Sequence, residues 1–138
     1  MTSVARATFA RTMERFERSA SEKTPYVLLD PAAGRLEVRG CSIHENADRF
    51  FLPLLDAVEA YAKAPAPRTR VVVALTYFNS SSAKYLLDLL KVLDEAHAAG
   101  LSQVELEWRY DEGDLDMQEA GEDFKGLLDL PVKVVERS

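Results

Sequence analysis

Residues 70–100 restrict the possible folds of this chain more than any other segment. Residues 70–75 contain a continuous apolar run that begins with three β-branched valines, the pattern of a central strand that is covered on both faces. Residues 83–99 then contain neither Gly nor Pro, and Gly100 follows at the point where a helix would end. The segment predicts a strand, a short turn and a helix, the repeating unit of sheets with parallel strands.

Three consecutive serines stand at the start of this predicted helix. Ser80, Ser81 and Ser82 follow Asn79, and Asn or Ser oxygens at such a junction accept hydrogen bonds from the first free backbone N–H groups. Asn79 and one serine can serve as caps, which leaves other hydroxyls exposed at the positive end of the helix dipole. Because a phosphate is electrostatically favoured there, the surplus of serines indicates a switch rather than a catalytic centre.

The other periodic segments predict a small domain of the α/β class. Further strands are predicted at residues 26–29, 35–39, 104–110 and 131–135, and further helices begin near Asn46 and Asp114. The first two strands form a hairpin, and Pro53 is expected to kink or restart the first helix. The prediction is a single domain with a mixed sheet of about five strands, an N-terminal hairpin plus parallel βαβ units, with helices packed on it.

A wide apolar arc covers most of the helix that follows the serines. Lys84, Asp88, Lys91 and Glu95 lie on one narrow charged face, and the remaining surface is apolar. Either a second helix covers the part of the arc that the sheet does not reach, which we favour, or that part is a partner surface.

The first 24 residues differ from the rest of the chain in charge. Residues 1–24 carry a net charge of +2 and residues 25–138 a net charge of −8, which together give the −6 of the whole chain. Phe9, Met13 and Phe16 recur at helical spacing. We therefore expect a basic N-terminal arm or short helix at 1–24, followed by the domain at 25–138.

The overall composition excludes several functions. A net charge of −6 disfavours binding to nucleic acid or to anionic membranes by bulk electrostatics. No apolar run approaches the roughly 20 residues that span a bilayer, and no secretory signal is recognisable, so we expect a cytoplasmic protein. Cys41 is the only cysteine, which excludes an internal disulfide and a cysteine-based zinc site. No cofactor is predicted.

Two chemical interpretations of local motifs remain open alternatives. Ser81 and Lys84 match the Ser-x-x-Lys pattern of penicillin-recognising enzymes, but the motifs that accompany it are missing and His97 lies far along the helix. A small serine hydrolase is therefore less favoured than a scaffold in which the serines only cap a helix. The acidic residues 111–123 do not fit a calcium loop, and they form either a solvated helix face or a surface for a basic partner.

An ordered series of segments resembles the SiaC family of bacterial regulatory phosphoproteins. They are Asp30 and Gly34 before Leu36-Glu37-Val38-Arg39-Gly40, Ser42-Ile43-His44-Glu45-Asn46, Phe50-Phe51-Leu52-Pro53-Leu54, the segment from Tyr77 to Lys84, and Trp108-Arg109-Tyr110 followed by residues 114–123. The resemblance covers about residues 26–135 and leaves the basic arm outside.

The resemblance implies a fold like that of STAS domains and a mechanism of partner switching. In such a system the unphosphorylated protein binds and activates a diguanylate cyclase, a cognate Ser/Thr kinase phosphorylates it, and a metal-dependent Ser/Thr phosphatase removes the phosphate. The family's phosphoacceptor lies in an Asn-Thr-Ser-Ser motif, so its counterpart here is Ser80 after Asn79, with Ser in place of Thr. Ser81 and Ser82 are the alternative acceptors.

A phosphate at this helix start would act on binding rather than on folding. It adds roughly −1.5 to −2 charges at neutral pH, which the helix N-terminus tolerates but which a partner would have to desolvate. The partner surface should therefore surround Ser80. The candidate contacts are Glu45, Asn46, Asn79, Ser81, Ser82, Lys84, Asp114, Asp116 and Glu119.

Overall fold

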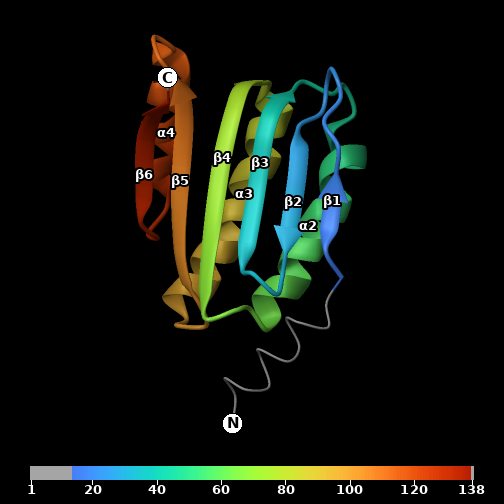
Figure 1. Ribbon diagram of the computed structural model, residues 1–138, viewed down its shortest axis with the longest axis vertical. Coiled ribbons are helices and arrows are strands. Elements are labelled where there is room, and N and C mark those ends of the chain that lie inside the picture. Colours follow the sequence, from blue (N-terminus) through green and yellow to red (C-terminus); the bar gives the residue numbers. More distant parts are fainter. Residues whose placement is uncertain (1–13, 138) are drawn as a thin grey trace.

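The computed structural model describes residues 14–137, which form one sheet covered by helices on a single face (Figure 1). The strands are β1 (Phe16–Arg18), β2 (Tyr26–Asp30), β3 (Arg35–Ser42), β4 (Arg68–Phe78), β5 (Gln103–Asp111) and β6 (Val132–Arg137), and the helices are α2 (Ala47–Lys63), α3 (Ser80–Ala98) and α4 (Leu115–Leu127). The six strands lie in sequence order, antiparallel from β1 to β3 and parallel from β3 to β6. This is the STAS-like α/β domain that the sequence predicts.

All three helices lie on one face because each connects two neighbouring parallel strands in the same direction across the sheet. Right-handed crossovers then place every helix on the same side, behind the sheet in Figure 1. The core lies between the helices and this face of the sheet. Its members include Leu36, Val38, Val71, Val73, Leu106 and Trp108 from the strands and Leu54, Val58, Leu86, Leu90 and Phe124 from the helices.

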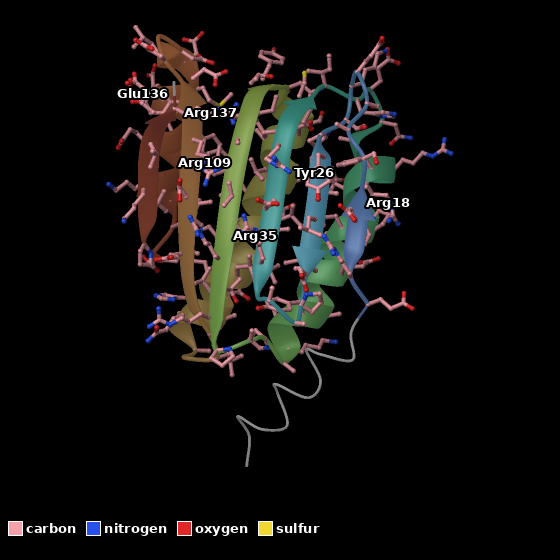
Figure 2. The ribbon with its side chains drawn as sticks, viewed as in Figure 1. Arg18, Tyr26, Arg35, Arg109, Glu136 and Arg137 are labelled. Carbon is pink, nitrogen blue, oxygen red and sulfur yellow. The ribbon has the colours of Figure 1, made fainter. Side chains whose placement is uncertain are left out.

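The helix-free face of the sheet is also buried at its centre, as the apolar run predicts. Val72 is 0% exposed and Ala74 1% exposed although no helix covers them. The strand register places Glu37 and Glu107 beside Val72, and these carboxylates lie in ion pairs with arginines, among them Arg35 at 2.7 Å. Charged side chains from the neighbouring strands therefore bury the second face of β4 (Figure 2).

Helix α2 packs against α3 and covers the excess of its apolar arc, as favoured above. The rings of Phe51 and Tyr85 are stacked with centroids 5.5 Å apart, and the charged face of α3 remains exposed. Pro53 lies inside α2 without interrupting it, so the predicted restart is wrong. Pro53 is exposed, so water can bond the carbonyl group that its missing N–H leaves unpaired.

The N-terminal region contributes a sixth strand that the sequence did not predict. Phe16 pairs with Leu29 in β1 and packs against the core, so it belongs to a strand and not to a helix. The open edge of β2 offers backbone hydrogen bonds that outweigh the weak helical spacing there. Phe9 and Met13 lie outside the described residues. No helix among residues 14–137 is long and apolar enough to cross a bilayer.

Candidate functional site

Three strand-to-helix junctions line the carboxyl edge of the parallel strands. Asn46, Asn79 and Asp114 begin α2, α3 and α4, and each side chain accepts a hydrogen bond from the backbone N–H three residues later, at 3.3, 2.9 and 3.1 Å. These bonds satisfy donors that the helices cannot satisfy themselves. The edge therefore presents three helix N-termini in a row, with the serines of α3 in the middle (Figure 1).

A β-bulge in β4 orients the residues just before the serines. The pairing of β3 with β4 shifts between Gly40 and Cys41 because Thr76 is an extra residue in β4. The extra residue lets Phe78 turn inward, where its ring packs against core aromatic rings. Tyr77 instead turns outward and is 59% exposed.

The three serines have different surroundings, and only two of them reach the surface. Ser80 and Ser81 are exposed, whereas Ser82 is 1% exposed. The Ser82 hydroxyl donates to the carbonyl oxygen of Ser42 at 3.0 Å and accepts from the Ser42 hydroxyl at 2.8 Å. Ser82 therefore joins α3 to the end of β3, and its burial argues against its candidacy as phosphoacceptor or partner contact.

The helix cap is Asn79 alone. Its side chain accepts from the backbone N–H of Ser82, and neither Ser81 nor Ser82 acts as the cap residue. The expectation that a serine shares this role is wrong because one Asn oxygen already occupies the capping position.

The start of α2 is attached to α3 beside the serines. The Tyr85 hydroxyl donates a hydrogen bond to the carboxylate of Asp48, and this bond raises the pKa of the Tyr85 phenol because the carboxylate favours its protonated form. Before the helix, the backbone N–H of Asn46 donates to Nδ1 of His44 at 2.9 Å. Glu45 is exposed and lies 3.8 Å from Lys23. The loop before α2 therefore has a defined shape.

The start of α4 presents the acidic side of this edge. Asp116 and Glu119 are exposed in its first turns, and Asp114 is partly buried as the cap. Within residues 14–137 no cluster of His, Cys, Asp or Glu side chains could hold a metal ion. Asp116 and Glu119 are exposed and can face solvent or a partner.

The arrangement does not support serine catalysis. The ammonium group of Lys84 lies 5.9 Å from the centroid of the Tyr85 ring. His97 accepts a hydrogen bond from the backbone N–H of Val104 at 3.1 Å, and it lies roughly 25 Å along α3 from the serines. A hollow of about 420 Å³ lined by Arg68 and His97 also lies at the opposite, amino end of the strands. Within residues 14–137, no hydrogen bond joins Ser81 to a basic side chain.

Sequence reasoning missed two exposed apolar side chains at this edge. The predicted strand ended at residue 75, and nothing in the sequence indicates the bulge that turns Tyr77 outward. Leu115, at the first position of α4, is 71% exposed. It lies outside the buried stripe of Met117 and Phe124, and this departure from the helical period was the available signal.

Comparisons with known proteins identify a family and a relative that each match most of this chain. The sequence profile described as SiaC family regulatory phosphoprotein matches residues 18–137. An uncharacterized protein of Pseudomonas aeruginosa strain UCBPP-PA14 is 32% identical over 114 residues, which is 83% of this chain and 90% of the relative.

Solved structures of Pseudomonas aeruginosa SiaC share the fold. Apo-SiaC has a TM-score of 0.79 at 29% identity, covering 89% of this chain and 99% of SiaC. The crystal structure of the diguanylate cyclase SiaD in complex with its activator SiaC gives a TM-score of 0.83 at 30% identity, covering 88% of this chain and 99% of the matched chain.

Proposed function

Because this chain belongs to the SiaC family of regulatory phosphoproteins, we propose that it is a non-enzymatic cytoplasmic switch that binds and controls a diguanylate cyclase when unphosphorylated. A cognate Ser/Thr kinase phosphorylates Ser80 and releases the cyclase, and a metal-dependent Ser/Thr phosphatase restores binding. The similarity to SiaC, the activator of the diguanylate cyclase SiaD, supports the choice of partner.

The observation that carries the proposal is the environment of Ser80. Ser80 is exposed at the first position of α3, directly after the Asn79 cap. Burial argues against Ser82 as acceptor, and the family motif selects Ser80 over Ser81. A phosphate on Ser80 would meet the positive end of the α3 dipole, so the fold can accept it without rearrangement.

The same phosphate opposes a protein partner. A partner that covers Ser80 would have to desolvate about two added negative charges. Asp116 and Glu119 at the start of α4 already make this edge acidic, which raises the electrostatic penalty. Phosphorylation therefore breaks the complex while the domain stays folded.

The other candidate residues divide into two groups. Glu45, Ser81, Lys84, Asp116 and Glu119 are exposed, and we assign them to the partner or kinase surface. Asn46, Asn79 and Asp114 act as caps, so they shape the three junctions on which that surface is built.

The test combines phosphate mapping with binding. The chain is co-expressed with its cognate kinase, and phosphopeptides are located by mass spectrometry. The cyclase affinities of wild type, Ser80→Asp and Ser80→Ala are then compared, and Ser81→Asp is measured beside them to test the alternative acceptor. We expect phosphate on Ser80, strong loss of binding in Ser80→Asp and retained binding in Ser80→Ala.

Two results would contradict the proposal in different ways. Phosphate mapped to Ser81 together with unchanged binding by Ser80→Asp would move the acceptor. If neither Ser80→Asp nor Ser81→Asp changes the affinity of the unphosphorylated chain for the cyclase, the protein is a constitutive scaffold.

A further inference from the structure

A β-bulge keeps the side chain of Tyr77 exposed to solvent. Side chains alternate between the faces of a strand, so a regular β4 that buries Leu75 would also bury residue 77 and expose residue 78. The bulge at Thr76 reverses this order and turns Tyr77 outward. Bulges that re-aim a side chain are concentrated next to functional sites. Tyr77 lies three residues before Ser80, so the bulge is evidence that its exposed side chain has a functional role.

A second exposed apolar side chain lies on the element that packs against the end of β4. The ring of Phe78 contacts the ring of Phe124 in α4, with centroids 6.3 Å apart, so the end of β4 and helix α4 are in contact. Leu115 begins α4 at the same carboxyl edge of the sheet. Tyr77 and Leu115 are thus apolar groups on a surface otherwise formed by caps, exposed serines and charged residues.

A phosphate weakens a complex strongly only where the interface with the partner would bury it. At a solvated rim, water and salt screen its charge within about 10 Å, and the loss of affinity is small. Near the dry centre of an interface it must be desolvated, which is costly. Phosphate sensitivity at Ser80 therefore requires an apolar centre close by, and such centres are enriched in Tyr.

Four large apolar side chains are exposed among the described residues, and two of them lie at this edge. They are Leu52, Tyr77, Leu115 and Leu127. Leu127 ends α4 at the opposite end of that helix, and Leu52 lies in the second turn of α2. Tyr77 and Leu115 can form the centre, with Glu45, Lys84, Asp116 and Glu119 as its polar rim.

We infer that Tyr77 and Leu115 are the apolar anchors of the interface with the diguanylate cyclase, filling an apolar pocket on the cyclase whose rim closes over Ser80. The inference rests on the proposed function and names the contacts that make it sensitive to phosphate. The cyclase is the chosen occupant because SiaC, which has the same fold and 30% identity to this chain, is the activator of the diguanylate cyclase SiaD in a solved complex.

The experiment measures affinity for the purified cognate cyclase by isothermal titration calorimetry, using unphosphorylated protein. We expect Tyr77→Ala to weaken binding about 30-fold and Leu115→Ala about 10-fold, as anchors in buried pockets do. Leu127→Ala, the matched control with 52% exposure, should stay within about 2-fold. Thermal unfolding should be unchanged, because all three side chains are exposed.

A double variant tests whether Tyr77 and Ser80 share one buried centre. Ser80→Asp should weaken binding less in the Tyr77→Ala background than in wild type, because the pocket is already lost. Additive effects, or equal affinities of Tyr77→Ala and Leu127→Ala for a cyclase that binds wild type, would overturn the anchor assignment and leave the switch standing. Wild-type protein that does not bind the cyclase would overturn both.

Discussion

Replacing Ser82 by Ala should destabilise the domain, although the same change at Ser81 should not. Ser82→Ala removes two buried hydrogen bonds to Ser42, at 2.8 and 3.0 Å, and leaves a Ser42 hydroxyl that is itself buried without its acceptor. At about 1 kcal/mol for each bond, the loss is about 2 kcal/mol.

The matched control is Ser81→Ala, one residue away on the same helix turn. Ser81 is exposed, so this variant changes only helix propensity, which favours Ala by roughly 0.5 kcal/mol. Since that gain applies to both variants, the difference between them reports the buried bonds. We expect Ser82→Ala to be about 2 kcal/mol less stable than Ser81→Ala.

The assay is urea unfolding followed by fluorescence. Trp108 is the single tryptophan and is 0% exposed, so its emission reports the core directly. Ser42→Ala and the double variant complete a cycle that isolates the pair. Equal free energies of unfolding for Ser81→Ala and Ser82→Ala would refute the assignment of Ser82 as the buried tie between α3 and β3.

Two further predictions concern the packing and the charges of the sheet. A Cβ at Gly121 would stand 2.5 Å from the Trp108 ring, so Gly121→Ala should lower the free energy of unfolding by about 2 kcal/mol. A Cβ at Gly126 on the same helix would meet no atom within 4 Å, so Gly126→Ala should raise it by up to about 1 kcal/mol. Equal melting temperatures of the two variants would contradict this prediction. A hydrogen bond from Arg109, the largest cause, lowers the pKa of Glu107 below its usual 4.5. The stability from Glu107 is therefore present above pH 4.5 and lost as pH falls through the lowered pKa. Glu107→Gln should cost about 1 kcal/mol at pH 7 in urea unfolding, and a gap that persists at pH 2 would rule out the ion pair as its source.

The parts of the site that local chemistry determines were predictable from the sequence. Asn46 and Asn79 are polar residues at the starts of periodic helices, and both are caps as the pattern indicates. The division of labour among the serines was not predictable, because Ser82 is buried by Ser42, which lies 40 residues earlier in the chain. The bulge at Thr76 also depends on register with β3 and leaves no local signal.

The fold class was predictable because apolar periodicity reports burial, but periodicity does not say what does the burying. Val71 to Leu75 of this run are buried on both faces, as the pattern indicates, yet helices cover only one face. Glu37 and Glu107 complete the other face with their arginine partners. Those residues come from neighbouring strands, so the sequence of β4 alone could not reveal them.

The geometry of the first turn of α3 makes folding and partner binding respond oppositely to phosphate. Asn79 takes up the N–H of Ser82 with its side chain and that of Ala83 with its carbonyl group, while the N–H groups of Ser80 and Ser81 have no acceptor within the helix. A phosphate on Ser80 can accept from those amides, so it should raise the free energy of unfolding by roughly 0.3–1 kcal/mol. The same phosphate, held rigidly against the helix start, cannot move aside from a partner that covers the edge.

Differential scanning calorimetry of the phosphorylated and unphosphorylated forms would therefore show a small rise in melting temperature alongside the loss of cyclase binding. A fall in melting temperature would mean that phosphate breaks the complex by unfolding the site and not by repelling the partner.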